Sequence, residues 1–201
     1  LLVELNGRQI RSVALAGSIA RGLNDQEDMI LEQQLIRSKK DQNEHNLVVQ
    51  EILQNLAPLA HEIRSPSTPL LLQLSNIQHL ETKIVATAVE GVDILSLVES
   101  LHPTPAVGGV PSQEARDTIS KSESQSRGWY SGPVGWLDPR GNGQFAVALR
   151  AALTVGHNTR LYAGSGIVAN SHPNKEWEET ELKFRPFLDA LGSVIPGSSS
   201  L

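Results

Sequence analysis

The sequence predicts an α+β fold in which a largely antiparallel β-sheet is flanked by helices. A pair of β-type segments opens the chain, and two stretches with helical apolar spacing follow it. The last third contains a β-meander, whose strands are separated by the turn sequences DPRGNG and GHN, and it leads into a helix. Antiparallel strands interspersed with helices are typical of the α+β class.

The opening segment LLVELNGRQIRSVALAGS places Asn6 and Gly7 between two β-type runs. Because Asn-Gly is the pair that a type I′ hairpin turn favours, we predict such a turn there. The chain has no initiator Met and begins inside a strand-like run. We therefore expect it to be the C-terminal part of a longer protein, with some functional residues upstream of Leu1.

The helical region begins with a capping signal. Asn24 followed three residues later by Glu27 fits a capping pair, and the first turn is acidic, as the positive end of a helix dipole prefers. One face of this helix is apolar, at Met29, Ile30, Leu35 and Ile36. After the charged break SKKDQNEH, which contains Glu44, apolar spacing between Leu47 and Leu59 predicts a second helix.

The rest of the chain predicts further strands and helices. The expected strands cover residues 79–89, 132–137, 144–155 and 159–168. The expected helices cover residues 92–101, 112–124 and 173–192, and residues 64–76 are loop-like. Pro186 should end or kink the last helix near Arg185, because proline has no amide donor.

Charge and composition restrict the class of partner. The chain has 17 Lys and Arg against 22 Asp and Glu, a net charge of −5 and no basic run. These features disfavour nucleic acid or an anionic membrane as a partner and leave small molecules and proteins. No apolar stretch approaches the length of about 18 residues that suggests a membrane span. Cysteine is absent, which is compatible with an intracellular setting, and we expect a cytoplasmic protein.

An acidic helix near the C-terminus contains the first candidate site. Glu176, Glu179 and Lys183 are spaced so that they share one helix face. Two carboxylates on such a face could hold Mg²⁺, which takes oxygen ligands and usually keeps waters and substrate oxygens. The alternative is a solvated charged face, which is the more common meaning of a Glu/Lys pattern.

A glycine-containing segment, AGSGIV, precedes this helix. Gly164 and Gly166 permit close backbone approach, and their N–H groups could bind a carboxylate. The segment is not a phosphate loop, because it lacks the Lys-Ser/Thr ending and does not directly open a helix. A strand end or a bulge is the more common explanation of such glycines.

Arg150 stands in an otherwise apolar strand-like run, FAVALRAAL. Period-2 alternation places it with Ala146 and Ala148, whose small side chains leave room for an anion. The alternative is an edge-strand Arg paired with a structural carboxylate. His79 and His102 are more often structural than catalytic in such contexts. No Ser/His/Asp or Cys/His arrangement can be assembled, and no paired His or Cys spacing indicates zinc.

Eight motifs occur in the order and spacing of one enzyme family. They are ALAGSIARG (14–22), SKKDQNEHNLVV (38–49), HL (79–80), LHPTPAVGGVP (101–111), RGWYSGPVGW (127–136), FAVALRAAL (145–153), YAGSGIV (162–168) and EWEETELK (176–183). The sequence resembles the chorismate-utilising enzymes and, among them, most resembles the isochorismate synthases. The resemblance spans essentially all 201 residues, and eight ordered motifs are far more specific than any one of them. It implies that residues 1–192 are the C-terminal part of a chorismate-binding catalytic domain and that residues 193–201 are a frayed tail.

The resemblance implies a pocket for chorismate that also binds Mg²⁺. The implied metal carboxylates are Glu44 and Glu179, with Glu176 in a supporting position. The positions implied to hold the substrate's carboxylates are Arg150, Tyr162, Gly164, Gly166 and Lys183. The positions implied to form the wall around the ring are Gly17, Ser18 and His79. The glycine turn and the acidic helix would form two sides of one pocket, where Mg²⁺ offsets repulsion between Glu residues and a dicarboxylate.

The resemblance also separates related reactions. Anthranilate-type members carry GTxSGAPK where this chain has HPTPAVGGVP, and members with a lysine nucleophile place it in IKGT where this chain has Ala16. Ammonia and lysine chemistry are therefore disfavoured, and the implied reaction is water attack at C2 of chorismate with loss of the C4 hydroxyl. Salicylate formation or another chorismate-utilising reaction is the runner-up, and a non-catalytic interaction domain is the alternative from another class. The family's base, a Lys, and its acid, a Glu, precede the LAGS motif, and we expect both upstream of Leu1.

Overall fold

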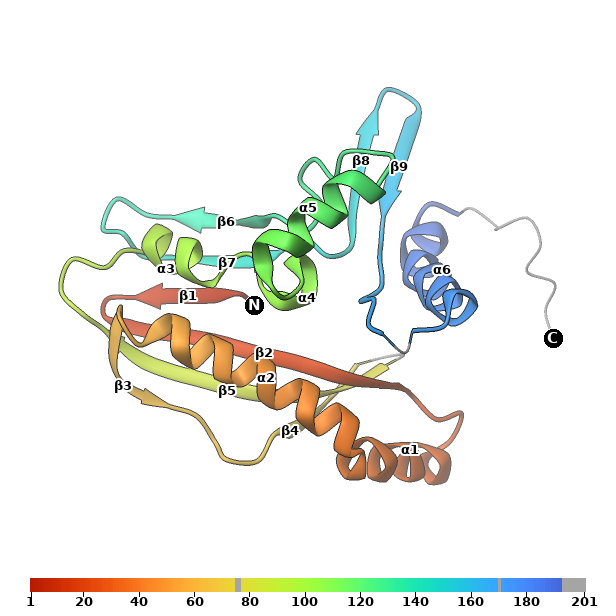
Figure 1. The fold of residues 1–201 in the computed structure, drawn as a ribbon, viewed down its shortest axis with the longest axis horizontal. Coiled ribbons are helices and arrows are strands. Elements are labelled where there is room, and N and C mark those ends of the chain that lie inside the picture. Colours follow the sequence, from red (N-terminus) through yellow and green to blue (C-terminus); the bar gives the residue numbers. More distant parts are fainter. Residues whose placement is uncertain (75–76, 170, 193–201) are drawn as a thin grey trace. The chain divides into compact units, whose positions relative to one another are not determined.

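The computed structural model describes residues 1–74, 77–169 and 171–192. It confirms the α+β class, because antiparallel strands and helices are interspersed along the chain (Figure 1). The chain divides into two compact units, of which the first contains residues 1–102 and 133–146 and the second contains residues 103–132 and 147–201. The predicted frayed tail lies outside the described residues.

The described part of the first unit is built on one seven-stranded sheet. Its strands are β1 (Val3–Asn6), β2 (Gln9–Ala20), β3 (Ala60–Arg64), β4 (Leu70–Gln73), β5 (Ile77–Ala88), β6 (Pro133–Leu137) and β7 (Gly143–Val147). The order across the sheet is β3-β5-β2-β1-β7-β6, and β4 also pairs with β5. The pairs β1–β2, β1–β7, β2–β5, β3–β5 and β4–β5 are antiparallel.

Three helices accompany this sheet in the described residues. They are α1 (Asp25–Arg37), α2 (Lys39–Leu56) and α3 (Ile94–Leu101). Helix α2 runs beside β2 (Figure 1). It buries a single stripe, namely His45, Val49, Ile52 and Leu56. Steps of three and four residues place this stripe on one helix face. Alternate residues of β2 and β5, including Ile10, Ala14, Leu80 and Ile84, are buried in the same core.

The predicted cap of α1 is confirmed, and the predicted break after it is wrong. Asn24 accepts a hydrogen bond from the amide of Glu27 at 3.0 Å, and the Glu27 carboxylate accepts one from Leu23. Ser38 both ends α1 and caps α2, since its hydroxyl accepts a hydrogen bond from the amide of Asp41. Glu44 therefore lies well inside α2. One side-chain cap is enough to start this helix, although its first turns contain few apolar residues that could have predicted it.

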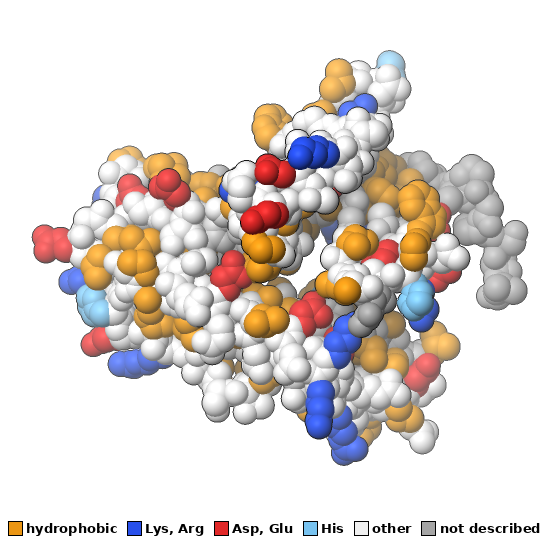
Figure 2. Space-filling view, viewed as in Figure 1, with side chains coloured by type: hydrophobic (Ala, Val, Ile, Leu, Met, Phe, Trp, Pro, Cys, Tyr) orange, Lys and Arg blue, Asp and Glu red, His pale blue; other side chains and the backbone are white. Residues whose placement is uncertain are grey.

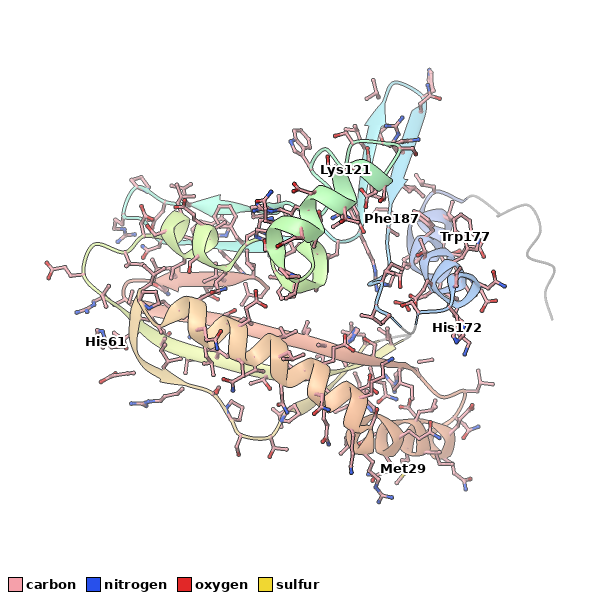
Figure 3. All side chains as sticks on the ribbon, in the orientation of Figure 1. Met29, His61, Lys121, His172, Trp177 and Phe187 are labelled. Atoms are coloured by element: carbon pink, nitrogen blue, oxygen red, sulfur yellow. The ribbon has the colours of Figure 1, made fainter. Side chains whose placement is uncertain are left out.

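The apolar face predicted for α1 is mostly exposed. Leu35 is buried, but Met29 is 66% exposed and projects outward from the helix (Figure 3). Ile30 and Ile36 are exposed as well. Asp28 takes the remaining buried position, because the guanidinium of Arg21 pairs with its carboxylate at 2.6 Å. Apolar spacing identified the helix but not the face that it buries.

The second unit contains shorter elements. They are α4 (Pro105–Gly108), α5 (Ser112–Ser122), β8 (Ala151–Val155), β9 (Asn158–Tyr162) and α6 (Pro173–Ala190). Strands β8 and β9 form an antiparallel hairpin across the predicted GHN turn. Helix α6 buries none of its described residues fully, and Trp177 projects from it and is 66% exposed (Figure 3).

Four predicted boundaries differ from the structure. The expected strand 144–155 is two strands, interrupted at 148–150, and the expected strand 159–168 ends at Tyr162. The loop-like segment 64–76 contains β4. Helix α6 continues past Pro186 to Ala190, so the first of the two predicted effects of Pro186, an end near Arg185, is wrong, and the second, a kink, stays a prediction. A proline this close to the end removes one backbone hydrogen bond while the last turn still closes.

The opening hairpin is confirmed, but its turn lies one residue later than predicted. Asn6 pairs with Gln9, so the two central residues are Gly7 and Arg8. Gly7 has a φ of +60°, whereas Arg8 is not among the described residues with positive φ. A type I′ turn needs positive φ at both central positions, and a type II′ turn needs it only at the first, where glycine is preferred. The pattern therefore indicates a type II′ turn.

The surface agrees with the charge pattern of the sequence. Lys and Arg side chains are interspersed with acidic and apolar ones on the face shown in Figure 2. None of the helices in the described ranges combines the length and the apolar character that a membrane crossing requires.

Candidate functional site

Gly17 and Ser18 lie at an irregularity in the central strand pair. The register of β2 against β5 shifts between Ala16 and Ser18, which leaves Gly17 as the extra residue of a β-bulge. Gly17 has a φ of +73°, in the left-handed region that favours glycine. Ser18 stands opposite His79, and its Oγ lies 2.7 Å from Nδ1 of that histidine. The structure therefore brings together the three residues implied to form the ring wall.

Helix α2 approaches this bulge closely. A Cβ atom at position 17 would lie 3.0 Å from Cβ of Asp41. Glu44 follows Asp41 by three residues, so it continues the same helix face, and it is exposed. The next residue, His45, points into the core, where its Nε2 lies 2.7 Å from Oγ1 of Thr82. This buried pair anchors the part of α2 from which Glu44 projects.

Gly17→Ala should lower the free energy of unfolding by about 2 to 3 kcal/mol, because it adds both left-handed strain and a steric clash. The new Cβ would lie 3.0 Å from Asp41 and 3.3 Å from Leu80. Gly7→Ala is the matched control, since Gly7 has a φ of +60° but no atom of the described residues lies within 4 Å of the new Cβ. The control should lose only about 1 kcal/mol. Urea denaturation measures both losses, and equal values would refute the clash.

Acidification should destabilise the folded protein through two histidines whose Nδ1 atoms are buried, His45 and His102. Burial lowers the pKa of His45 and of His102 below the ordinary value of 6.5, and the Ala16 backbone offsets part of the effect at His45. Nδ1 of each ring has no hydrogen-bond partner among the described residues. Below pH 6.5 the unfolded chain therefore binds protons that the folded chain does not, and the free energy of unfolding falls. Above that pH these two groups have no effect.

Urea denaturation between about pH 7.5 and about pH 5 tests this pH dependence. His45→Asn should show a shallower loss of stability on acidification than the wild type, whatever its stability at neutral pH. A loss of the same steepness would show that His45 does not contribute.

In the second unit, the turn of residues 164–166 lies against α6. Ser165 Oγ donates a hydrogen bond to a carboxylate oxygen of Glu176. Lys183 Nζ donates to the carbonyl oxygen of the first glycine of the turn at 2.9 Å, and it pairs with Glu179 Oε1 at 2.7 Å. The three predicted helix residues therefore share the face that meets the glycine turn, as their spacing indicates.

Tyr162 belongs to an aromatic stack that the sequence did not reveal. Its ring centroid lies 5.7 Å from that of Tyr130, with 19° between the ring planes. The guanidinium carbon of Arg127 lies 5.8 Å from the centroid of the Tyr130 ring. Burial raises the pKa of Tyr130, so its hydroxyl stays protonated at neutral pH. The motif RGWYSG contains Arg127 and Tyr130, but no local pattern in the sequence links this motif to Tyr162.

The two glycines of the turn differ in what they allow. A Cβ at position 164 would lie 2.7 Å from the hydroxyl oxygen of Tyr130, so Gly164 makes room for that side chain. At Gly166 nothing lies within 4 Å of an added Cβ in the described residues. The backbone at Gly166 is therefore the part of the turn that a ligand could approach.

The predicted strand position of Arg150 is wrong. Arg150 lies in the interruption between β7 and β8, and it is exposed. The alternation that placed it with Ala146 and Ala148 does not apply, because residue 148 has left the strand: its N–H and C=O bond the backbone of Gly132 and Ser131. No ion pair between Arg150 and a carboxylate is found among the described residues of its unit, so its guanidinium is open to an anion.

Comparison with known proteins places these features in a family. Residues 1–192 match the sequence model of the family described as chorismate binding enzyme. The chain belongs to this family. The family resemblance predicted from the eight motifs is therefore confirmed.

Individual relatives agree with this assignment. The chain is 43% identical over 191 residues to isochorismate synthase MenF of Bacillus subtilis, which covers 95% of this chain and 41% of the relative. It is 45% identical over 193 residues to the salicylate biosynthesis isochorismate synthase of Pseudomonas aeruginosa, covering 96% and 40%. The solved structure of MenF, the menaquinone-specific isochorismate synthase of Escherichia coli, superimposes with a TM-score of 0.84 at 35% identity, covering 92% and 42%. The chain thus spans less than half the length of each.

The carboxylates of this chorismate binding enzyme suit Mg²⁺ chemically. Glu44 is in the first unit, whereas Glu176 and Glu179 are in the second. Within the described residues no group of three or more His, Asp or Glu side chains is arranged to hold a metal ion by itself. Mg²⁺ is usually bound by one or two carboxylates together with waters and substrate oxygens, so a small set of glutamates fits the ion.

Proposed function

We propose that the enzyme containing this chain converts chorismate to isochorismate. Water adds at C2 of the ring while the C4 hydroxyl leaves. The proposal rests on the 43% and 45% identity, across nearly the whole chain, to two proteins that are named isochorismate synthases. HPTPAVGGVP and Ala16, which stand where related enzymes carry ammonia-type and lysine-type motifs, support water as the nucleophile.

The second unit would bind the negative charge of the substrate. Chorismate carries two carboxylates, and Arg150 and Lys183 offer cations on either side of the glycine turn in the sequence. Tyr162 can donate from its hydroxyl, and the N–H groups of Gly164 and Gly166 can donate from the backbone. Charged hydrogen bonds of this kind both bind and orient an anion, because they fix the direction from which each oxygen is approached.

The first unit would contribute a wall for the ring. Gly17 lets α2 pack closely against the bulge, since a Cβ there would lie 3.0 Å from Cβ of Asp41. Ser18 and His79 hold each other at 2.7 Å across the strand pair, so their polar atoms are fixed before substrate binds. Preorganised groups lose little entropy on binding, which favours a single ring orientation.

We further propose that Glu44 and Glu179 hold Mg²⁺, with Glu176 as a supporting carboxylate. When bound, the ion would neutralise charge between the glutamates and a substrate carboxylate. The observation that supports this set is that Glu176 and Glu179 face the same turn as Lys183. Lys183 supplies a second positive charge there, which limits the repulsion between the glutamates and an anionic substrate.

Product analysis tests the proposed reaction. The protein expressed from the complete natural gene is incubated with chorismate and Mg²⁺, and products are separated by liquid chromatography against isochorismate, salicylate and anthranilate standards. Isochorismate as the product supports the proposal. Salicylate would favour the runner-up reaction, and anthranilate formed with added ammonium would contradict the choice of nucleophile. If the protein neither converts nor binds chorismate, this result would favour a non-catalytic interaction domain.

A further inference from the structure

Arg127 is held in one orientation by contacts within the second unit. Its guanidinium makes a bidentate ion pair with Glu123, with Nε to Oε2 at 2.8 Å and Nη2 to Oε1 at 2.5 Å. Nη1 donates to the carbonyl oxygen of Val107 at 2.9 Å and to Oγ of Ser131 at 3.3 Å. A planar fork with partners on three nitrogens cannot rotate freely, so the plane of the guanidinium is fixed.

The fixed guanidinium of Arg127 also contacts the aromatic stack of Tyr130 and Tyr162. It lies over the Tyr130 ring, which stacks on Tyr162, and the Tyr130 hydroxyl fills the space left by Gly164. Ser131, the residue after Tyr130, has a φ of +63°, a strained value for a residue other than glycine. Its N–H bonds the carbonyl oxygen of Ala148 at 2.8 Å. Such strain persists only where the surroundings impose it, which indicates that the placement of Tyr130 is enforced.

We propose that Arg127 is a positioning residue. It holds Tyr130 against Tyr162 and Gly164, and so fixes these two residues, which are proposed to bind a substrate carboxylate. This inference rests on the proposed function. Arg127 need not touch the substrate, since every link in the chain of contacts from Glu123 to Gly164 is a protein contact. Its side chain is 27% exposed and that of Glu123 is 41% exposed. Ion pairs of this exposure contribute little to stability, so orientation is the effect to measure.

A double-mutant cycle on the protein from the complete natural gene tests the proposal. Arg127→Ala should raise KM for chorismate about tenfold or more and lower kcat less, because Tyr162 and Gly164, which are proposed to bind the substrate carboxylate, lose their fixed positions. Tyr130→Ala should have a similar effect. The double variant should be no worse than the more impaired single variant, because both substitutions remove the same support. Arg127→Lys should fall in between, since it keeps a cation near the ring but loses the fork.

Controls separate the possible failures. Arg116→Ala on α5 is the matched control, because the Arg116 guanidinium contacts only α5 residues, Ser112 and Gln113, in the described structure. It should keep the wild-type KM. If Arg127→Ala does not fold, Arg127→Lys takes its place in the cycle. A wild-type KM in the folded Arg127 variant, or effects of Arg127 and Tyr130 that add, would overturn the proposal while the proposed function stands. Wild-type protein that neither binds nor converts chorismate would overturn both.

Discussion

Glu179→Gln is expected to reduce kcat by about 100-fold or more and to weaken the apparent affinity for Mg²⁺. Groups that only support a metal ligand cost about 10- to 100-fold when removed, so a ligand should cost at least as much. The substitution also breaks the ion pair with Lys183, in which Glu179 Oε1 and Lys183 Nζ lie 2.7 Å apart. Steady-state rates measured across a Mg²⁺ titration report both quantities. Glu44→Gln should behave in the same way, because it is proposed to hold the same ion.

The size of the effect separates a metal ligand from a partner of Lys183. An exposed ion pair with this spacing on a helix contributes only about 0.3 to 0.5 kcal/mol, whereas a 100-fold loss corresponds to about 2.7 kcal/mol. If Glu179 only orients Lys183, KM for chorismate changes and the Mg²⁺ dependence does not. Glu181→Gln is the matched control. Glu181 lies two residues after Glu179 on α6, so its side chain points away from the helix face that Glu179 and Lys183 share. An unaltered Mg²⁺ response in both Glu179→Gln and Glu44→Gln would refute the metal site.

Local chemistry predicts the starts of elements well. Asn24 and Glu27 form the expected cap, since all the atoms involved are within a few residues of one another. Ser38 was missed because the predicted boundary relied on apolar spacing, and the first turns of α2 contain almost no apolar residues. Apolar spacing also cannot say whether a face is covered. Met29 is exposed for that reason, although it lies on a well-formed helix.

Contacts between distant segments explain the remaining differences. The run FAVALRAAL has strand composition throughout, but Ala148 bonds the backbone of Ser131 and Gly132, and this diverts the chain before Arg150. The spacing of Glu176, Glu179 and Lys183 within one helix was enough to predict a shared face. The stack of Tyr130 on Tyr162 joins residues that have strands β6, β7 and β8 between them in the sequence, so no periodicity in the sequence could indicate it.

Arg150→Ala is expected to lower kcat/KM for chorismate by about 10- to 100-fold, mostly through KM, because a charged hydrogen bond to a carboxylate contributes about 1.5 to 3 kcal/mol. Some loss of kcat should accompany it, since a carboxylate clamp also orients the ring. Arg150→Lys should recover only part of the loss, because an ammonium cannot make the two parallel bonds of a guanidinium. Initial rates over a range of chorismate concentrations at saturating Mg²⁺ give both constants.

The matched control for this prediction is Arg160→Ala. Arg160 is an exposed arginine of β9, in the hairpin that directly follows Arg150, and it belongs to none of the eight motifs. Its removal changes the net charge of the second unit by the same amount as removal of Arg150, so any general electrostatic attraction of chorismate is lost equally in both variants. A loss confined to Arg150→Ala shows a direct contact with the substrate. Equal losses in the two variants would mean that Arg150 acts only through net charge, and wild-type kinetics in Arg150→Ala would show that the open guanidinium has no part in binding.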